Sequence, residues 1–227
     1  YHAERVIAEE FMKFLMTGTL YQGSKPVMWS PVEKTALAEA EIEYEDHTST
    51  TVYARFPVSQ PSHPALADAS IVIWTTTPWT MPGNRALACG NDIDYVVIRI
   101  DKIDEGSHAS IGDVIVLAEA LLEDVCAAIG IAGHTKLHQL TGADCVGTIA
   151  AHPLADHGYE HDVPLFHADY VTTEQGTGFV HIAPGHGVED YELSHLTHGV
   201  PVPDTVAEDG RIMEHLPLFA GMHVLRD

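Results

Sequence analysis

Apolar side chains recur at helical spacing in three stretches of the chain. The first predicts a helix that ends near Gly18, with an apolar face made of Val6, Ile7, Phe11, Phe14 and Leu15. The second predicts a helix over 118–129 that ends at Gly130, because glycine readily adopts the left-handed conformation that closes helices. A third, shorter helix is predicted over 187–197, ending near Gly199.

Short β-branched or alternating apolar runs predict strands elsewhere in the chain. The predicted strands are 42–44, 50–56, 71–74, 95–100, 114–117, 136–140, 146–150 and 179–182. Residues 26–31 are predicted to form an extended linker, and the proline-rich, serine-rich residues 57–68 a loop. Asp209-Gly210 predicts a turn.

Many short strands with few helices favour an α+β fold. We expect a β-barrel-like curved sheet with a few peripheral helices. Strands and helices do not alternate regularly along the chain, which disfavours a Rossmann fold.

The charge of the chain is strongly negative. Eleven Lys and Arg stand against 33 Asp and Glu, which gives a net charge of −22 with His neutral. Nucleic-acid affinity comes mostly from the neutralisation of phosphates, so this surface should repel polyanions. A nucleic-acid partner must therefore meet a local site or be held by something outside this chain.

The cysteines and the apolar runs indicate the compartment. Cys89, Cys126 and Cys145 are odd in number, widely spaced and not arranged as C-x-x-C, so a disulfide framework is not expected. No apolar run reaches the length of a membrane span, and no signal-peptide pattern opens the chain. We therefore expect a cytoplasmic protein. It begins inside a predicted helix without an initiator Met, which indicates a piece of a longer protein.

Residues 74–84, WTTTPWTMPGN, form the first segment with useful chemistry. Thr75, Thr76 and Thr77 follow a predicted strand and end on Pro78, which cannot continue a strand. Their hydroxyls then leave the sheet at a loop, where they can donate to and accept from a ligand. The β-propensity of threonine explains the same run without a ligand. Trp79 either walls a pocket or belongs to the core.

Residues 176–191, GTGFVHIAPGHGVEDY, form the second segment. Its glycines allow a close approach of the backbone to a ligand, and His181 ends a predicted strand. Asp190 falls in the first turns of a predicted helix, where a carboxylate caps the helix or pairs with a ligand ammonium. A zinc site of His181, His186 and Asp190 is disfavoured, because Pro184 interrupts the His-x4-His spacing and no Cys joins it. We expect neither a metal nor an organic cofactor.

The usual hydrolase and nucleotide-binding motifs are absent from the sequence. It contains no G-x-S-x-G, H-E-x-x-H, G-x-x-x-x-G-K-[ST] or G-x-G-x-x-G. A hydrolase built on this chain would therefore position water and stabilise the transition state, without a covalent intermediate.

The two segments together resemble the signature segments of the editing (CP1) domain of bacterial-type isoleucyl-tRNA synthetases. Residues 25–31 and 34–41 resemble the same enzymes, so the resemblance extends over about residues 1–195. Sister valyl and leucyl editing domains typically carry Arg after the second Thr of the first segment, where this chain has Thr77. The adenylate-forming signatures of a whole synthetase are absent, so no aminoacylation is expected from this chain.

The resemblance implies a post-transfer editing deacylase that hydrolyses the ester of mischarged Val-tRNA(Ile). It implies that Thr75, Thr76 and Thr77 line the site and hold the substrate and the attacking water. The implied partners are the 3′ end of tRNA(Ile) carrying valine and the catalytic core of the parent synthetase, with no membrane.

The remaining roles also rest on the resemblance. Trp79 and Asn84 would shape the pocket and the surroundings of the terminal adenosine. His181 would be the steric wall that rejects the extra methylene of isoleucine. Asp190 would pair with the α-ammonium of the substrate, a charge-assisted contact.

The implied organisation is a single editing domain, 1–227, cut from a larger synthetase. Residues of about 1–40 would lead into it, about 41–200 would form the editing core, and about 201–227 would lead out. Two alternatives remain: a tRNA-binding insertion without chemistry, and a free-standing deacylase that edits in trans. A basic face would mark the tRNA-binding insertion, and the net charge of −22 is against it.

Overall fold

The computed structural model describes residues 1–225. Its strands are β1 (Trp29–Ser30), β2 (Thr35–Ala36), β3 (Val52–Gln60), β4 (Ala69–Thr75), β5 (Ala86–Cys89), β6 (Asp94–Ile103), β7 (Val114–Ala118), β8 (Ile131–Thr141), β9 (Ile149–Ala151), β10 (Asp162–His167) and β11 (Phe179–Ile182). Its α-helices are α1 (His2–Met16), α2 (Leu122–Ile129), α3 (Gly142–Cys145) and α4 (Val188–Asp190). The 3-10 helices are η1 (Glu39–Glu41), η2 (Pro64–Leu66), η3 (Pro78–Gly83), η4 (Glu119–Leu121) and η5 (Ala155–His157), and η6 (Tyr191–Thr197) is a π-helix.

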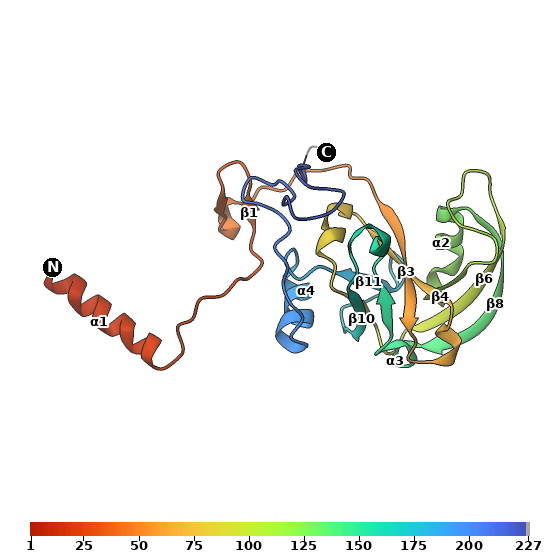
Figure 1. Ribbon diagram of the computed structural model, residues 1–227, viewed down its shortest axis with the longest axis horizontal. Coiled ribbons are helices and arrows are strands. Elements are labelled where there is room, and N and C mark those ends of the chain that lie inside the picture. Colours follow the sequence, from red (N-terminus) through yellow and green to blue (C-terminus); the bar gives the residue numbers. More distant parts are fainter. Residues whose placement is uncertain (226–227) are drawn as a thin grey trace.

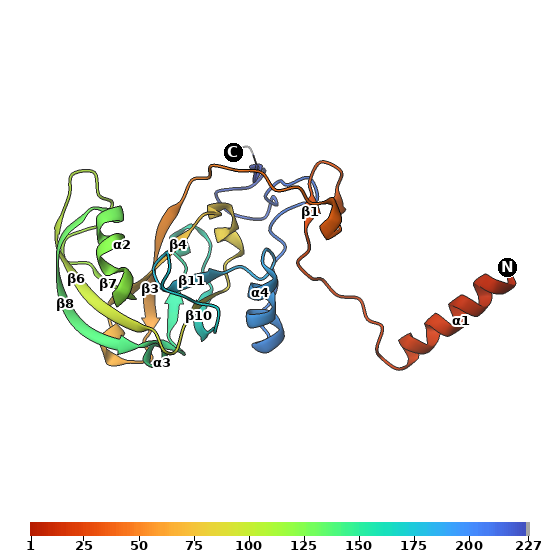
Figure 2. The ribbon, with the colours of Figure 1, turned by 180° about the vertical axis from the view of Figure 1, so that it is seen from behind.

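Nine strands form one mixed sheet, in the order β11-β5-β10-β9-β3-β4-β7-β6-β8. The pairs β5–β10 and β4–β7 are parallel and the other neighbours are antiparallel. Strands β6 and β8 curve around α2, and α1 projects away from the rest of the molecule (Figures 1 and 2). The α+β class is therefore confirmed.

The sheet does not close into a barrel, so that part of the prediction was wrong. Its two edge strands, β11 and β8, do not pair with each other within residues 1–225. Closure requires every strand to have two neighbours, and here β8 pairs with β6 alone. The strong curvature lies in β6 and β8 and leaves the other end of the sheet open (Figure 2).

The core lies between the sheet and the elements folded over it. Phe56, Ile71, Ile73, Tyr95 and Leu117 are completely buried in its main cluster. A second cluster, around Ala86, Ala88 and Ile182, packs β5 against β11. In α1 no residue is buried, so its apolar face contributes nothing to this core.

Several predicted elements differ from the observed ones. Residues 42–44 form no strand because the structure gives them no strand partner. The first residues of the predicted loop 57–68 belong instead to β3, in which Pro57 lies opposite Ser70 of β4. The helix predicted over 118–129 begins with a 3-10 turn before α2, and the strand predicted over 146–150 lies at 149–151. The helix predicted over 187–197 starts as α4 and continues as π-helix η6.

The topology brings the two sequence segments together. Strand β4 delivers the threonine run at its carboxyl end, and η3 follows directly. Strand β11 pairs antiparallel with β5, which places His181 opposite Leu87, and it contacts β4. The ends of β4 and β11 therefore lie at one place on the molecule.

Candidate functional site

The threonine run ends β4 and turns into η3. The Thr75 side chain is buried, whereas Thr76 and Thr77 are exposed. The Thr75 hydroxyl accepts the backbone N–H of Thr77 at 3.1 Å and lies 3.3 Å from the Thr77 hydroxyl. Because Thr75 Oγ1 accepts from the backbone, its own proton remains free for Thr77 or for a ligand.

His181 is held by two residues of the first segment. The Nδ2 amide of Asn84 lies 3.0 Å from His181 Nδ1, and the Thr80 hydroxyl lies 2.7 Å from His181 Nε2. Asn84 Nδ2 also donates to the Ala86 carbonyl at 2.9 Å and lies 3.4 Å from the Ile182 carbonyl, and these two acceptors fix the orientation of the amide. His181 Nδ1 must then be the acceptor, so the ring carries its proton on Nε2 and donates to Thr80.

The charge state of His181 follows from its burial. Only 9% of the residue is exposed, and burial lowers the pKa of the imidazole to about 4. The neighbouring His152 and His186 add to this shift. His181 is therefore neutral near pH 7 and presents a fixed, uncharged ring.

Asp190 lies at the end of α4 and turns toward β11. Its Oδ2 accepts the backbone N–H of Ala183 at 2.8 Å. Burial raises the pKa of this carboxyl to about 6, partly opposed by the Ala183 hydrogen bond and increased by Glu189. Such a carboxylate gains by meeting a cation, which replaces the solvation lost on burial.

These side chains surround one small cavity of about 260 Å³. It is lined by Trp74, Thr75, Thr76, Thr77, Thr80, Val180, His181, Ala183, His186 and Asp190. Five of the seven residues singled out from the sequence thus line the same space. Glu189, next to Asp190, is exposed and does not line it.

Trp79 and Asn84 are not among the lining residues. Trp79 packs edge-on against His186, with ring centroids 5.0 Å apart. Asn84 is completely buried behind His181. The sequence reasoning assigned no role to Thr80 or His186, although each stands within one of the two segments and His186 was considered only as a metal ligand.

The cavity combines groups that bind and orient, and it holds no activated nucleophile. It offers threonine hydroxyls, a neutral histidine and a half-buried carboxylate. Within residues 1–225 no three His, Cys, Asp or Glu residues are grouped to hold a metal ion. The chemistry that fits is the binding of a small cationic group beside a water held by hydroxyls.

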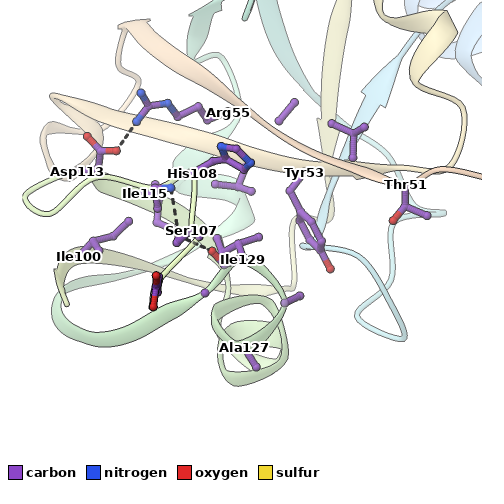
Figure 3. A pocket seen from close by; sticks show the side chains of 18 residues that line it. Thr51, Tyr53, Arg55, Ile100, Ser107, His108, Asp113, Ile115, Ala127 and Ile129 are labelled. Carbon is purple, nitrogen blue, oxygen red and sulfur yellow. Dashed lines mark hydrogen bonds and ion pairs between the residues drawn. The ribbon is translucent and has the colours of Figure 1, made fainter. Parts of the chain in front are cut away.

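A larger cavity, of about 670 Å³, lies between β3, the C-terminal end of α2 and the loop 105–109 (Figure 3). Three of its polar side chains are already engaged: Arg55 pairs with Asp113, and the Ser107 hydroxyl donates to the carbonyl of Ile129 at 2.7 Å. Among the described residues, no buried titratable side chain faces it. The smaller cavity is therefore the candidate site.

Comparisons with known proteins agree on one family. The family model described as tRNA synthetases class I (I, L, M and V) matches residues 2–209. The isoleucine–tRNA ligase of Gluconobacter oxydans is 49% identical over 229 residues, which cover 100% of this chain and 24% of that protein. The isoleucine–tRNA ligase of Caulobacter vibrioides is 50% identical over 230 residues, covering 98% and 23%. The chain spans about a quarter of the length of these curated relatives.

A solved structure shares the fold. The crystal structure of GlLeuRS-CP1 superposes with a TM-score of 0.51 and 17% identity, over 63% of this chain and 59% of that one. At this identity the likeness concerns the fold alone. In the described part of the chain, no helix is long and apolar enough to cross a membrane.

Proposed function

Because this chain belongs to the class I tRNA synthetases of the isoleucine, leucine, methionine and valine group, we propose that it is the editing region of an isoleucine enzyme. Its reaction is the hydrolysis of the ester that joins valine to tRNA(Ile), with exclusion of isoleucine. The observation that carries this proposal is the single cavity in which a half-buried carboxylate, a neutral histidine and three threonines meet.

The need for such a reaction is physical. Isoleucine and valine differ by one methylene, which an apolar pocket discriminates by only about 1–3 kcal/mol, a general magnitude for which isoleucine enzymes are themselves the standard example. A second pocket that admits valine and excludes isoleucine supplies the missing discrimination.

The geometry suggests a role for each group. The Asp190 carboxylate pairs with the α-ammonium of the bound valyl ester. The hydroxyls of Thr75, Thr76 and Thr77 hold the ester and a water beside its carbonyl carbon. That water adds to the carbonyl carbon, the bond from this carbon to the ribose oxygen breaks, a proton from the water ends on the ribose oxygen, and free valine and tRNA leave. The rate comes from orientation and hydrogen bonding, and the proposal requires no metal or cofactor.

His181 supplies the discrimination. Its ring lines the cavity and is fixed by Asn84 and Thr80, so it cannot swing aside for a longer side chain. A rigid wall is what a steric sieve needs, because a movable one would yield to the extra methylene.

The partners follow from the same proposal. They are the 3′ end of tRNA(Ile) carrying valine and the catalytic core of the parent synthetase, in the cytoplasm. The leading residues, about 1–40, and the last residues, about 201–227, would connect an editing core of about 41–200 to that parent.

The test is the variant His181→Ala. We expect it to hydrolyse Ile-tRNA(Ile) while retaining hydrolysis of Val-tRNA(Ile), with a gain for isoleucine of about 10–200-fold, the range that one methylene allows. Deacylation time courses on both esters measure it. Unchanged rejection of isoleucine would remove His181 as the wall. Tight tRNA binding by the unaltered protein without hydrolysis of either ester would favour a tRNA-binding insertion without chemistry.

A further inference from the structure

The 3-10 helix η3 carries Thr80 and leads directly into Asn84, the two residues that fix His181. Pro78 and Pro82 lie within it and have no N–H to donate. At the two ends of η3, the Thr80 N–H donates to the Thr77 carbonyl and the Asn84 N–H donates to the Met81 carbonyl, both at 3.0 Å. Because its two prolines cannot donate, η3 has fewer backbone hydrogen bonds than a proline-free turn of the same length, and contacts from outside help to hold its shape.

The connection between β9 and β10 supplies those contacts through two histidines. His152 Nε2 lies 3.0 Å from the Met81 carbonyl, and His161 Nε2 lies 2.9 Å from the Asn84 carbonyl. The Met81 carbonyl only accepts, so His152 donates from Nε2. His161 Nε2 also lies 3.3 Å from Arg85 Nη1, but its contact with the Asn84 carbonyl is shorter, and we assign its Nε2 as the donor to that carbonyl. The guanidinium of Arg85 also donates to the Pro82 and Asn84 carbonyls. The carbonyls of Met81, Pro82 and Asn84 thus accept hydrogen bonds from a cluster formed by His152, His161 and Arg85.

His152 is the most constrained member of the cluster. It is 1% exposed, and its Nδ1 accepts the backbone N–H of Leu154 at 3.1 Å, so both ring nitrogens are satisfied in one tautomer. Its ring stacks on Tyr159, with centroids 5.0 Å apart, and meets the edge of Phe56. Burial lowers the pKa of His152 to about 4, so the ring stays neutral and keeps this pattern at pH 7.

The path from His152 to the cavity has few steps. The Met81 carbonyl that His152 holds also accepts the backbone N–H of Asn84. The Asn84 side chain donates to His181 Nδ1, and His181 lines the cavity. A shift of the Met81 carbonyl therefore moves the residue that sets the tautomer and orientation of His181.

We propose that His152, assisted by His161, is a positioning residue that holds η3 and thereby fixes the tautomer and orientation of His181. The effect of this positioning on the choice between valine and isoleucine rests on the proposed function, whereas the effect on the His181 ring does not. His152 does not line the cavity and does not meet the substrate. It acts through Met81 and Asn84, and its loss frees the His181 ring to rotate and to exchange tautomers.

The first test reads the His181 ring directly and needs no substrate. Nitrogen-15 NMR of the 227-residue chain distinguishes protonated from unprotonated imidazole nitrogens, with the His181 signals assigned by comparison with His181→Gln. We expect Nδ1 unprotonated and Nε2 protonated in the unaltered protein and mixed tautomers in His152→Phe. The variant His152→Gln keeps a donor near the Met81 carbonyl and should restore the single tautomer.

A matched control removes a hydrogen bond made by Tyr159, whose ring stacks on His152 but which does not bond to η3. The Tyr159 hydroxyl donates to the Pro217 carbonyl at 2.8 Å, so Tyr159→Phe keeps the stacked ring and leaves η3 untouched. It should not change the His181 signals. If His152→Phe does not fold, the half-buried His161→Phe is the second variant, and it should shift the same signals in the same direction.

The second test measures deacylation of Val-tRNA(Ile) and Ile-tRNA(Ile). His152→Phe should lower the preference for valine by about tenfold, within the range set by one methylene, and His152→Gln should recover most of it. Unchanged His181 signals in folded His152→Phe or His161→Phe would overturn the positioning role. Altered signals in a protein that hydrolyses neither ester would uphold the positioning role and refute the proposed function instead.

Discussion

His181 and Asp190, two of the titratable groups that line the cavity, have shifted pKa values that suit the roles proposed for them. The pKa of His181 falls to about 4 and that of Asp190 rises to about 6, each because burial disfavours the charged form. Near pH 7 the histidine is neutral and the carboxyl is mostly ionised. Of these two groups, only Asp190 then changes its charge between pH 7 and pH 5.

This shift gives Asp190 opposite effects on activity and on stability. Its folded-state pKa is raised, so its contribution to stability is present below the unfolded pKa of 3.8 and is lost as the pH rises through about 6. Asp190→Asn should abolish most deacylation and raise the free energy of unfolding at pH 7 by about 1–3 kcal/mol. The gain should shrink from pH 7 to pH 5. Deacylation time courses and urea unfolding at both pH values measure the two effects.

Glu189→Gln is the control for this prediction. Glu189 is exposed and outside the cavity, and neighbouring helical positions point about 100° apart. The variant should leave activity unchanged and should alter stability far less than Asp190→Asn, because it removes only the repulsion between Glu189 and the Asp190 carboxylate. If Glu189→Gln lost activity and Asp190→Asn kept it, the ammonium partner would be Glu189.

The position of a single residue was predictable from the sequence where it depends only on the neighbouring residues in the chain. The strand before Thr75 and the proline after Thr77 were sufficient to predict hydroxyls at a strand end. The side chain of Asn84 was not predictable, because its direction depends on the carbonyls of Ala86 and Ile182, and the latter lies on β11. The roles of His152 and His161 also depend on contacts between segments that are distant in the sequence, and a local sequence pattern carries no information on such contacts.

At the scale of elements, Gly176 and Gly178, which lie just before β11, should differ in how much an alanine substitution destabilises the protein. Gly178 has a φ of +80°, and an added Cβ would lie 2.4 Å from the Cβ of Ala118. Gly176 has a φ of +82°, but its nearest neighbour would be Trp74 Cε3 at 3.7 Å. Gly178→Ala therefore meets both backbone strain and a clash, whereas Gly176→Ala meets strain alone.

We expect Gly178→Ala to destabilise the protein by about 2–4 kcal/mol and Gly176→Ala by about 1–2 kcal/mol. Urea unfolding followed by circular dichroism gives both values. Equal costs for the two variants would mean that β7 and the loop move apart to accept the methyl group.

The predictability of the strands followed their periodicity and composition. Residues 179–182 were predicted with the observed bounds of β11, and 71–74 lie within β4. Strand β5 was missed because Ala86–Cys89 is short, has no β-branched residue and no alternation, and is buried on all sides between β10 and β11. Residues 42–44 carry a strand-like pattern, but no neighbouring strand in the described part of the chain pairs with them.

At the scale of the whole molecule, the resemblance to isoleucyl-tRNA synthetases is confirmed by the family match and by the relatives. The α+β class is confirmed as well, and the barrel is not. Closure could not be deduced from the sequence, because it depends on whether the first and last strands of the sheet meet. Those are β11 and β8, whose pairing no local pattern encodes.

The net charge of −22 sets an expectation for RNA binding by the chain as a whole. We expect it to bind tRNA(Ile) weakly, because few phosphates can be neutralised, and with little dependence on salt. Filter binding or anisotropy at about 50 and 200 mM salt measures this, since a protein contacting many phosphates loses about 10³–10⁵ in affinity over that range. Tight, strongly salt-dependent binding would contradict it.

The hydrogen bond between Thr80 and His181 joins residues 101 positions apart. Closing so long a loop carries an entropic cost that must be met before the bond forms, and such non-local contacts slow folding. The cavity therefore cannot assemble during synthesis until β11 and α4 have emerged from the ribosome. At an elongation rate of about 5–20 residues per second, the threonine run waits several seconds for its partners. During that interval the apolar side chains of β4 that later meet β11 stay uncovered, open to association with other nascent chains.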